Sequence, residues 1–383
     1  MNTANSPSAY TSDTPHVPYS FRGLILLGLC FLCRASLPAA EQPDPLAVFS
    51  DPARIWGRGA ERVIEEAYRL CFKTRIIGGK VMILRMPFAQ NNERDKLTAK
   101  DWGFLGGGKA NPEFLWETIE KVLDGAYFKK YTQALQDGRE KVLILDIPSQ
   151  TWSITRELFD LARMKAGSYR GLLHRPYILV SGKGVEDTDV YNYLYCIART
   201  GMDCSGFVWH ILSYTAAAGG LDLGKILSRE VNTPAGGDPS YYIGTWLFNS
   251  RSSQITGVKD EIRSLQPADI LLFRAADGGM AHSAIIQSID FSRGVIRYLQ
   301  CTDEAPPEER GVHESSIYFD PRRPELSLKD PSLRWTQQRY PPFAGENPSP
   351  FSDDGLRFRA YPELGGGRVV RFKAVTEAIA RLK

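Results

Sequence analysis

Apolar residues in the first half of the chain recur with helical spacing. Val63, Ala67, Leu70 and Cys71 follow one another at i, i+4, i+7 and i+8, which places them on one helix face. Two later stripes repeat similar spacing: Leu115, Ile119, Val122 and Ala126, then Ile154, Leu158, Leu161 and Ala162. Each stripe predicts an amphipathic helix that packs one face into a core. Apolar runs at 81–86, 142–147 and 177–180 predict short strands, so this half indicates a mixed α/β fold.

The pattern changes to strands and turns after residue 265. Pro267-Ala268-Asp269 is a turn signal that leads into an apolar run at 270–273, and further strands are predicted from His282 and across 294–301. Strands that follow one another in the sequence are usually neighbours in a sheet. We therefore expect an antiparallel sheet here and an α+β fold for the chain.

Prolines and glycines interrupt the pattern beyond residue 320. Residues 356–361 predict a strand that completes the sheet. Residues 369–382 predict a closing strand or helix.

The first 40 residues have the order of a secretory signal. A polar start leads to Arg22, then to an apolar run at 24–33, then to Arg34 and small residues that end at Ala40. The run is short for a helix that spans a membrane. We expect a signal peptide or N-terminal anchor over 1–40, and cleavage, retention and lipidation of the segment remain open.

Length and composition favour two domains after this segment. A length of 383 residues, at about 150 residues per domain, suggests two domains, and Gly182-Lys183-Gly184 marks the boundary between them. We expect an accessory mixed α/β domain of unknown role at 41–184 and a second domain at 185–383 with a Pro/Gly-rich extension. The 43% of apolar residues excludes a disordered chain. The net charge of +3, without a basic run interleaved with aromatics, gives no reason to expect nucleic acid as a partner.

One cysteine stands where a thiol can become a nucleophile. Asp203-Cys204-Ser205-Gly206-Phe207 opens an apolar helical stretch, and Asp203 fits the N-cap position. The unpaired N–H groups and the macrodipole of a helix start stabilise a thiolate, so we expect a lowered pKa for Cys204. Taken alone, Cys204 fits a buried core residue as well.

A cysteine nucleophile needs a base, and the chain has five histidines. Period-two alternation places His282, Ala284 and Ile286 on one face of their strand, where the small Ala284 would let the helix of Cys204 approach. Gln300 on the following strand can accept a hydrogen bond from the imidazole and fix its tautomer. Asp303 and His313 are alternatives for this orienting role.

These three segments resemble the NlpC-type family of papain-like cysteine peptidases, known as bacterial cell-wall endopeptidases. The resemblance covers about residues 185–320 and rests on Asp203-Cys204-Ser205-Gly206-Phe207, on Pro267-Ala268-Asp269 followed by His282, and on Gln300. Ala268 departs from the family, which usually has glycine there. The upstream Tyr-x-Trp-Gly-Gly segment is replaced by 191–196, where Tyr193 stands nearest the expected spacing.

The resemblance implies a papain-like core with Cys204 as nucleophile, His282 as general base and acid, and Gln300 as orienting residue. It also suggests substrate or oxyanion roles for Asp203, Ser205 and Tyr193. The implied reaction cleaves an amide bond of a peptidoglycan stem peptide through a thioester, without a metal or organic cofactor. The implied location is the periplasm or cell envelope of a bacterium, with membrane association only through the N-terminal segment.

Alternative functions remain on the same scaffold. They are an N-acyl amidase or acyltransferase, and a catalytically silent wall-binding protein. The bond that is cut and the oligomeric state are also open.

Overall fold

The computed structural model describes the part of the chain that forms one compact unit. The described residues are 59–89, 111–125, 128–129, 143–144, 177–178, 190–191, 193–194, 200–228, 243–302, 310–338, 350–352 and 354–382. Contacts divide the chain into residues 1–43 and 44–383, and all described residues belong to the second unit. The predicted signal segment, the helical stripe at 154–162 and the boundary near 184 lie outside the described residues.

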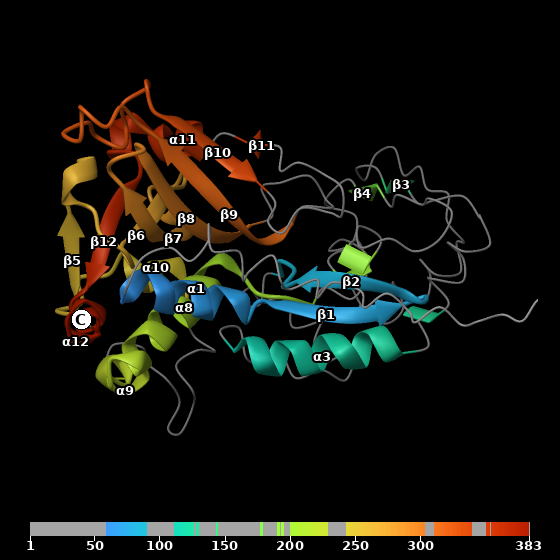
Figure 1. The fold of residues 1–383 in the computed structure, drawn as a ribbon. Coiled ribbons are helices and arrows are strands. Elements are labelled where there is room, and N and C mark those ends of the chain that lie inside the picture. Colours follow the sequence, from blue (N-terminus) through green and yellow to red (C-terminus); the bar gives the residue numbers. More distant parts are fainter. Residues whose placement is uncertain are drawn as a thin grey trace, which may run out of the picture. The chain divides into compact units, whose positions relative to one another are not determined.

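The centre of the fold is an eight-stranded antiparallel sheet (Figure 1). Its order is β11-β10-β9-β8-β7-β6-β12-β5, so the strands from β6 to β11 are neighbours in chain order. The strands are β5 Ile255–Val258, β6 Ile270–Arg274, β7 Met280–Asp290, β8 Val295–Thr302, β9 Gly311–Tyr318, β10 Arg334–Gln338, β11 Pro350–Ser352 and β12 Arg368–Phe372. The structure is a mixed α+β fold, and the predicted antiparallel sheet is confirmed.

Helices and two small two-stranded sheets complete the described fold. The helices are α1 Ala60–Arg69, α3 Pro112–Asp124, α8 Cys204–Ala218, α9 Leu223–Leu227, α10 Thr245–Phe248, α11 Asp354–Arg359 and α12 Lys373–Arg381, with 3-10 turns η5 Ile262–Ser264 and η7 Pro362–Leu364. The small sheets pair β1 Phe72–Ile77 with β2 Lys80–Arg85, and β3 Leu143–Ile144 with β4 Tyr177–Ile178. The first two predicted stripes fall mainly on α1 and α3. Leu70 and Cys71 follow the end of α1, where Leu70 is 48% exposed, and Ala126 lies outside the described residues.

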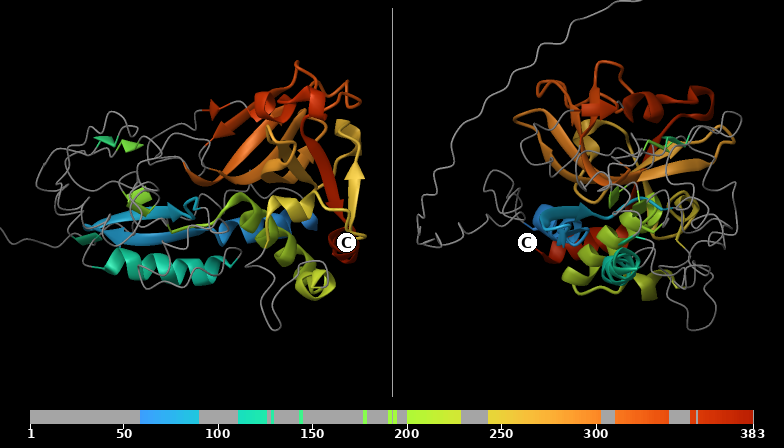
Figure 2. Two further views of the ribbon diagram at one scale, coloured as in Figure 1. Left: turned by 180° about the vertical axis from the view of Figure 1, so that it is seen from behind. Right: turned by 90° about the vertical axis from the view of Figure 1, so that its right-hand side faces the viewer.

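The sheet carries a hydrophobic core on each face. On one face, α8 packs with Ile285 of β7 and Leu299 of β8, and the same core includes residues of α1 and α3. On the other face, Ala284 and Ile286 of β7 pack with Phe358 of α11. Figure 2 shows α11 on the side of the sheet away from α1 and α8.

The alternation in β7 corrects one expectation about the approach of α8. Ala284 belongs to the core opposite α8, so it is not the small residue that admits the helix. The residues of β7 that face α8 have odd numbers, namely Ser283 beside Cys204 and Ile285 in the shared core. Because both faces of β7 are buried from His282 to Ser288, its pattern carried no signal for which face meets the helix.

The C-terminal segment corrects a second expectation. Residues 356–361 do not form a strand, because Asp354–Arg359 is the helix α11. The helix buries Phe358 against Trp335 with ring centroids 5.1 Å apart, and it leaves Leu356 67% exposed. Residues 369–382 supply both of the elements that were predicted as alternatives, the strand β12 and then the helix α12.

The turn before β6 holds a non-glycine residue in the left-handed region. Ala268 has a φ of 71°, and its N–H donates to Ile286 O at 2.8 Å. This backbone conformation favours glycine, which is the residue that the resembled family carries at this position. Asp269, the next residue, is buried and forms an ion pair with Arg371 of β12.

Candidate functional site

Cys204 is the first residue of α8, and its capping follows the predicted pattern. Asp203 accepts a hydrogen bond from the Gly206 N–H at 2.6 Å, which confirms it as the N-cap. The hydroxyl of Ser205 lies 3.0 Å from the same carboxylate oxygen. Phe207 and Val208 anchor the first turn in the core, so the position of the half-buried Cys204 is fixed from both sides.

The pKa of Cys204 is higher than the sequence suggested. The pKa is raised to about 11, chiefly by burial and next by the charge of Asp203, while the N–H groups of Ser283 and Ser205 act in the opposite direction. The expectation of a lowered pKa is therefore wrong for the unliganded site. The helix start was visible in the sequence, whereas the burial of the sulfur was not.

The contact with Ser283 brings the sulfur to the strand that carries the predicted base. Ser283 is fully buried in β7 and follows His282 directly. No hydrogen bond among the described residues joins the Cys204 sulfur to the His282 imidazole. The His282 side chain lies with Ala284 on the face of β7 opposite α8, and its ring contacts Phe273 with centroids 5.2 Å apart. The structure therefore does not bring the imidazole and the sulfur together.

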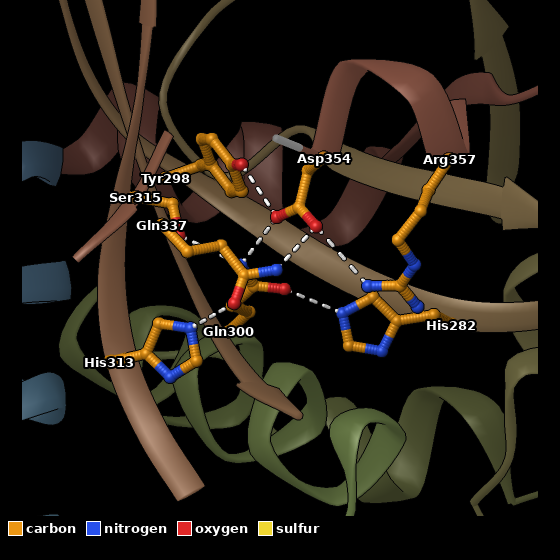
Figure 3. A network of polar contacts seen from close by, with 8 residues as sticks. All are labelled: His282, Tyr298, Gln300, His313, Ser315, Gln337, Asp354 and Arg357. Carbon is orange, nitrogen blue, oxygen red and sulfur yellow. Dashed lines mark hydrogen bonds and ion pairs between the residues drawn. The ribbon is translucent and has the colours of Figure 1, made fainter. Parts of the chain in front are cut away.

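The structure brings His282 and Gln300 together. His282 Nε2 lies 2.8 Å from Gln300 Oε1, and both side chains are buried (Figure 3). The other ring nitrogen of His282 points away from Gln300. Of the alternatives for the orienting role, His313 contacts Gln337 at 2.9 Å instead, and Asp303 lies outside the described residues.

A buried carboxylate that the sequence did not reveal stands behind this pair. Asp354 Oδ2 accepts hydrogen bonds from Gln300 Nε2 at 2.7 Å and from the Tyr298 hydroxyl at 2.8 Å. Its other oxygen accepts from Gln337 Nε2 and from Arg357 Nη1. Burial raises the pKa of Asp354, but the charge of Arg357 and the Gln300 hydrogen bond outweigh it and leave the pKa below its ordinary value. The carboxylate is therefore ionised at neutral pH.

The same surroundings keep His282 uncharged. Its pKa is lowered to about 3, chiefly by burial and next by the charge of Arg357, while Asp354 and Gln300 act in the opposite direction. At neutral pH the His282 imidazole is therefore neutral, and the Cys204 thiol is protonated. The site therefore holds no preformed thiolate, and its imidazole lies on the other face of β7 from the sulfur.

The tyrosine proposed for substrate binding is a core residue in the structure. Tyr193 is 1% exposed and packs edge to face against Phe128, with ring centroids 4.9 Å apart. Its neighbour Tyr191 bridges β2, since its hydroxyl accepts from the Arg85 N–H and donates to Ile83 O. A substrate or oxyanion role for Tyr193 therefore has no exposed surface to support it.

Two further properties concern the described residues as a group. They contain no cluster of three or more His, Cys, Asp or Glu side chains arranged to hold a metal ion. Among the described helices, none has the length and apolar character needed to cross a membrane.

Fold and site together define a mixed α+β protein, in which an antiparallel sheet carries a buried His–Gln–Asp network and packs against a helix that begins with cysteine. Comparison with protein-family models, with curated proteins and with solved structures found no match for this chain.

Proposed function

We propose that this protein is an exported cysteine hydrolase that cleaves an amide bond in peptidoglycan stem peptides. The main support is the hydrogen bond between His282 and Gln300 on adjacent strands, together with the position of Cys204 beside Ser283, the residue that follows His282. A helix-terminal cysteine, a neutral imidazole and an amide that orients the ring are the parts that nucleophilic catalysis requires. The class of substrate, the papain-like fold and the export rest on the resemblance to the NlpC-type family.

The proposed reaction requires the His282 imidazole to turn from the face of β7 opposite α8 towards Cys204, and it then begins with transfer of the Cys204 proton to His282 Nδ1. The sulfur attacks the substrate carbonyl, and N–H groups at the start of α8 stabilise the oxyanion. His282 then protonates the leaving amine, and a thioester remains on Cys204. Water hydrolyses the thioester with His282 again as base. Because the free thiol has a high pKa and the imidazole a low one, proton transfer accompanies the attack on substrate and does not precede it.

Digestion of purified peptidoglycan tests the proposal. We expect wild type to release fragments and Cys204→Ala to release none, with mass analysis identifying the cut. Cys71→Ala is a matched control, because Cys71 is also a free cysteine but lies fully buried in the core. Fragments from both wild type and Cys204→Ala, or from neither, would contradict the proposal. A cut within the peptide supports an endopeptidase, one between sugar and peptide an amidase, and a transferred acyl group an acyltransferase.

A further inference from the structure

The Asp354 carboxylate determines which way the Gln300 amide can point. An ionised carboxylate has only acceptor oxygens, so the group of Gln300 that faces it must be the NH₂. Gln300 Nε2 lies 2.7 Å from Asp354 Oδ2 and 2.8 Å from the Ser315 hydroxyl, which is able to accept as well. The amide oxygen of Gln300 is therefore left to face His282.

The orientation of Gln300 in turn determines the tautomer of His282. An amide oxygen only accepts, so His282 Nε2, at 2.8 Å from it, must carry the proton. A neutral imidazole has one protonated nitrogen, and the lone pair of His282 then lies on Nδ1. Nδ1 is the nitrogen that points away from Gln300 (Figure 3).

We propose that Asp354 is a positioning residue, which acts through Gln300 to hold His282 with its proton on Nε2 and its lone pair on Nδ1. The catalytic meaning of this role rests on the proposed function, because only a hydrolase needs Nδ1 as a base. The tautomer itself does not depend on any activity. It can therefore be measured independently.

Asp354→Asn separates the two orientations of Gln300. The Arg357 guanidinium can only donate, so it keeps the oxygen of the new amide on its side. The new NH₂ then faces Gln300 and the Tyr298 hydroxyl, which can turn to accept. Gln300 must rotate its amide and present its own NH₂ to His282. Because His282 Nε2 must now accept, the proton moves to Nδ1.

A double variant restores the original tautomer with different residues. In Asp354→Asn/Gln300→Glu, the carboxylate introduced at position 300 accepts from the new amide on one side and from His282 Nε2 on the other. The number of buried negative charges equals that of wild type. We expect His282 to return to the Nε2-protonated form.

Nitrogen NMR of the full chain labelled at histidine measures the tautomer, with the His282 signals assigned by their loss in His282→Gln. We expect protonated Nε2 in wild type, protonated Nδ1 in Asp354→Asn and protonated Nε2 in the double variant. Asp269→Asn is the matched control, because Asp269 is also a buried carboxylate paired with an arginine, and it should leave the tautomer unchanged. Protonated Nδ1 in wild type, or protonated Nε2 in Asp354→Asn, overturns the proposal. If Asp354→Asn does not fold, protonated Nδ1 in wild type still overturns the proposal.

The second measurement is the rate of peptidoglycan cleavage. For Asp354→Asn we expect kcat to fall on the order of 10²- to 10⁴-fold, as for loss of a general base, with KM nearly unchanged and recovery in the double variant. The expected tautomers without cleavage by wild type would refute the proposed function and leave the positioning role intact. Cleavage that survives a confirmed tautomer change would refute the positioning role alone.

Discussion

Replacement of Ala268 by glycine tests whether its left-handed backbone stores strain. Ala268 has a φ of 71° and its methyl group is buried in the core beside α8. An L-residue in this conformation costs about 1–2 kcal/mol, which Ala268→Gly removes. The same change loses a buried methyl group worth about 0.8 kcal/mol. It also adds about 0.4–1 kcal/mol of chain entropy to the unfolded state.

These contributions nearly cancel, so we expect Ala268→Gly to change the free energy of unfolding by less than about 1 kcal/mol. Ala284→Gly is the matched control, because Ala284 is also a buried alanine but has no positive φ. There the methyl and entropy losses add to about 1.5 kcal/mol without any relief of strain.

Urea unfolding of the two variants and wild type compares these values through the midpoint, provided that the m-values agree. An equal loss of stability in both variants would refute the reasoning, because it would mean that Ala268 carries no strain. A gain above about 1 kcal/mol in Ala268→Gly would mean that the strain exceeds the ordinary cost of this conformation.

Three further changes have outcomes that follow from the structure. Because the pKa of Cys204 is about 11, its alkylation by iodoacetamide should keep accelerating above pH 9. A plateau below pH 8 would contradict this. Burial lowers the pKa of three histidines from 6.5 to about 3 or 4. They are His210, His282 and His313. Because the unfolded chain binds more protons than the folded one below pH 6.5, stability should fall from pH 6.5 towards 4, and unfolding midpoints independent of pH would exclude this linkage. Gly294→Ala should lower the free energy of unfolding by more than about 2 kcal/mol, because Gly294 has a φ of 67° and an added Cβ would collide with the Phe319 carbonyl. An unchanged melting temperature would show that the turn adapts.

The parts of the site that the sequence predicted are those that depend on neighbouring strands and local helix signals. His282 and Gln300 meet because β7 and β8 are consecutive and antiparallel. Asp203 caps α8 because its side chain and the third residue after it are close in every helix of this kind. Both interactions join residues in the same element or in consecutive elements. The side-chain periods of a strand, two residues, and of a helix, 3.6 residues, are enough to predict them.

The parts that were missed depend on tertiary contacts between distant segments. Asp354 reaches Gln300 across 54 positions, through a helix that the apolar pattern mistook for a strand. Its only local signal is an acidic residue in the first turn of α11. The face of β7 that meets α8 was hidden for a related reason, because strands buried on both sides lose the contrast between inside and outside.

The same carboxylate holds two Gln–His pairs, and their hydrogen bonds decide which histidine can act as a base. Gln337 joins Asp354 to His313 as Gln300 joins it to His282. Both ring nitrogens of His313 are engaged, since Nδ1 lies 3.0 Å from Gly311 O and Nε2 2.9 Å from Gln337 Oε1. His282 uses only Nε2 among the hydrogen bonds of the described residues, and it precedes the serine that contacts the Cys204 sulfur. A proton acceptor needs a lone pair that no other group occupies, so of these two buried histidines only His282 meets the requirement.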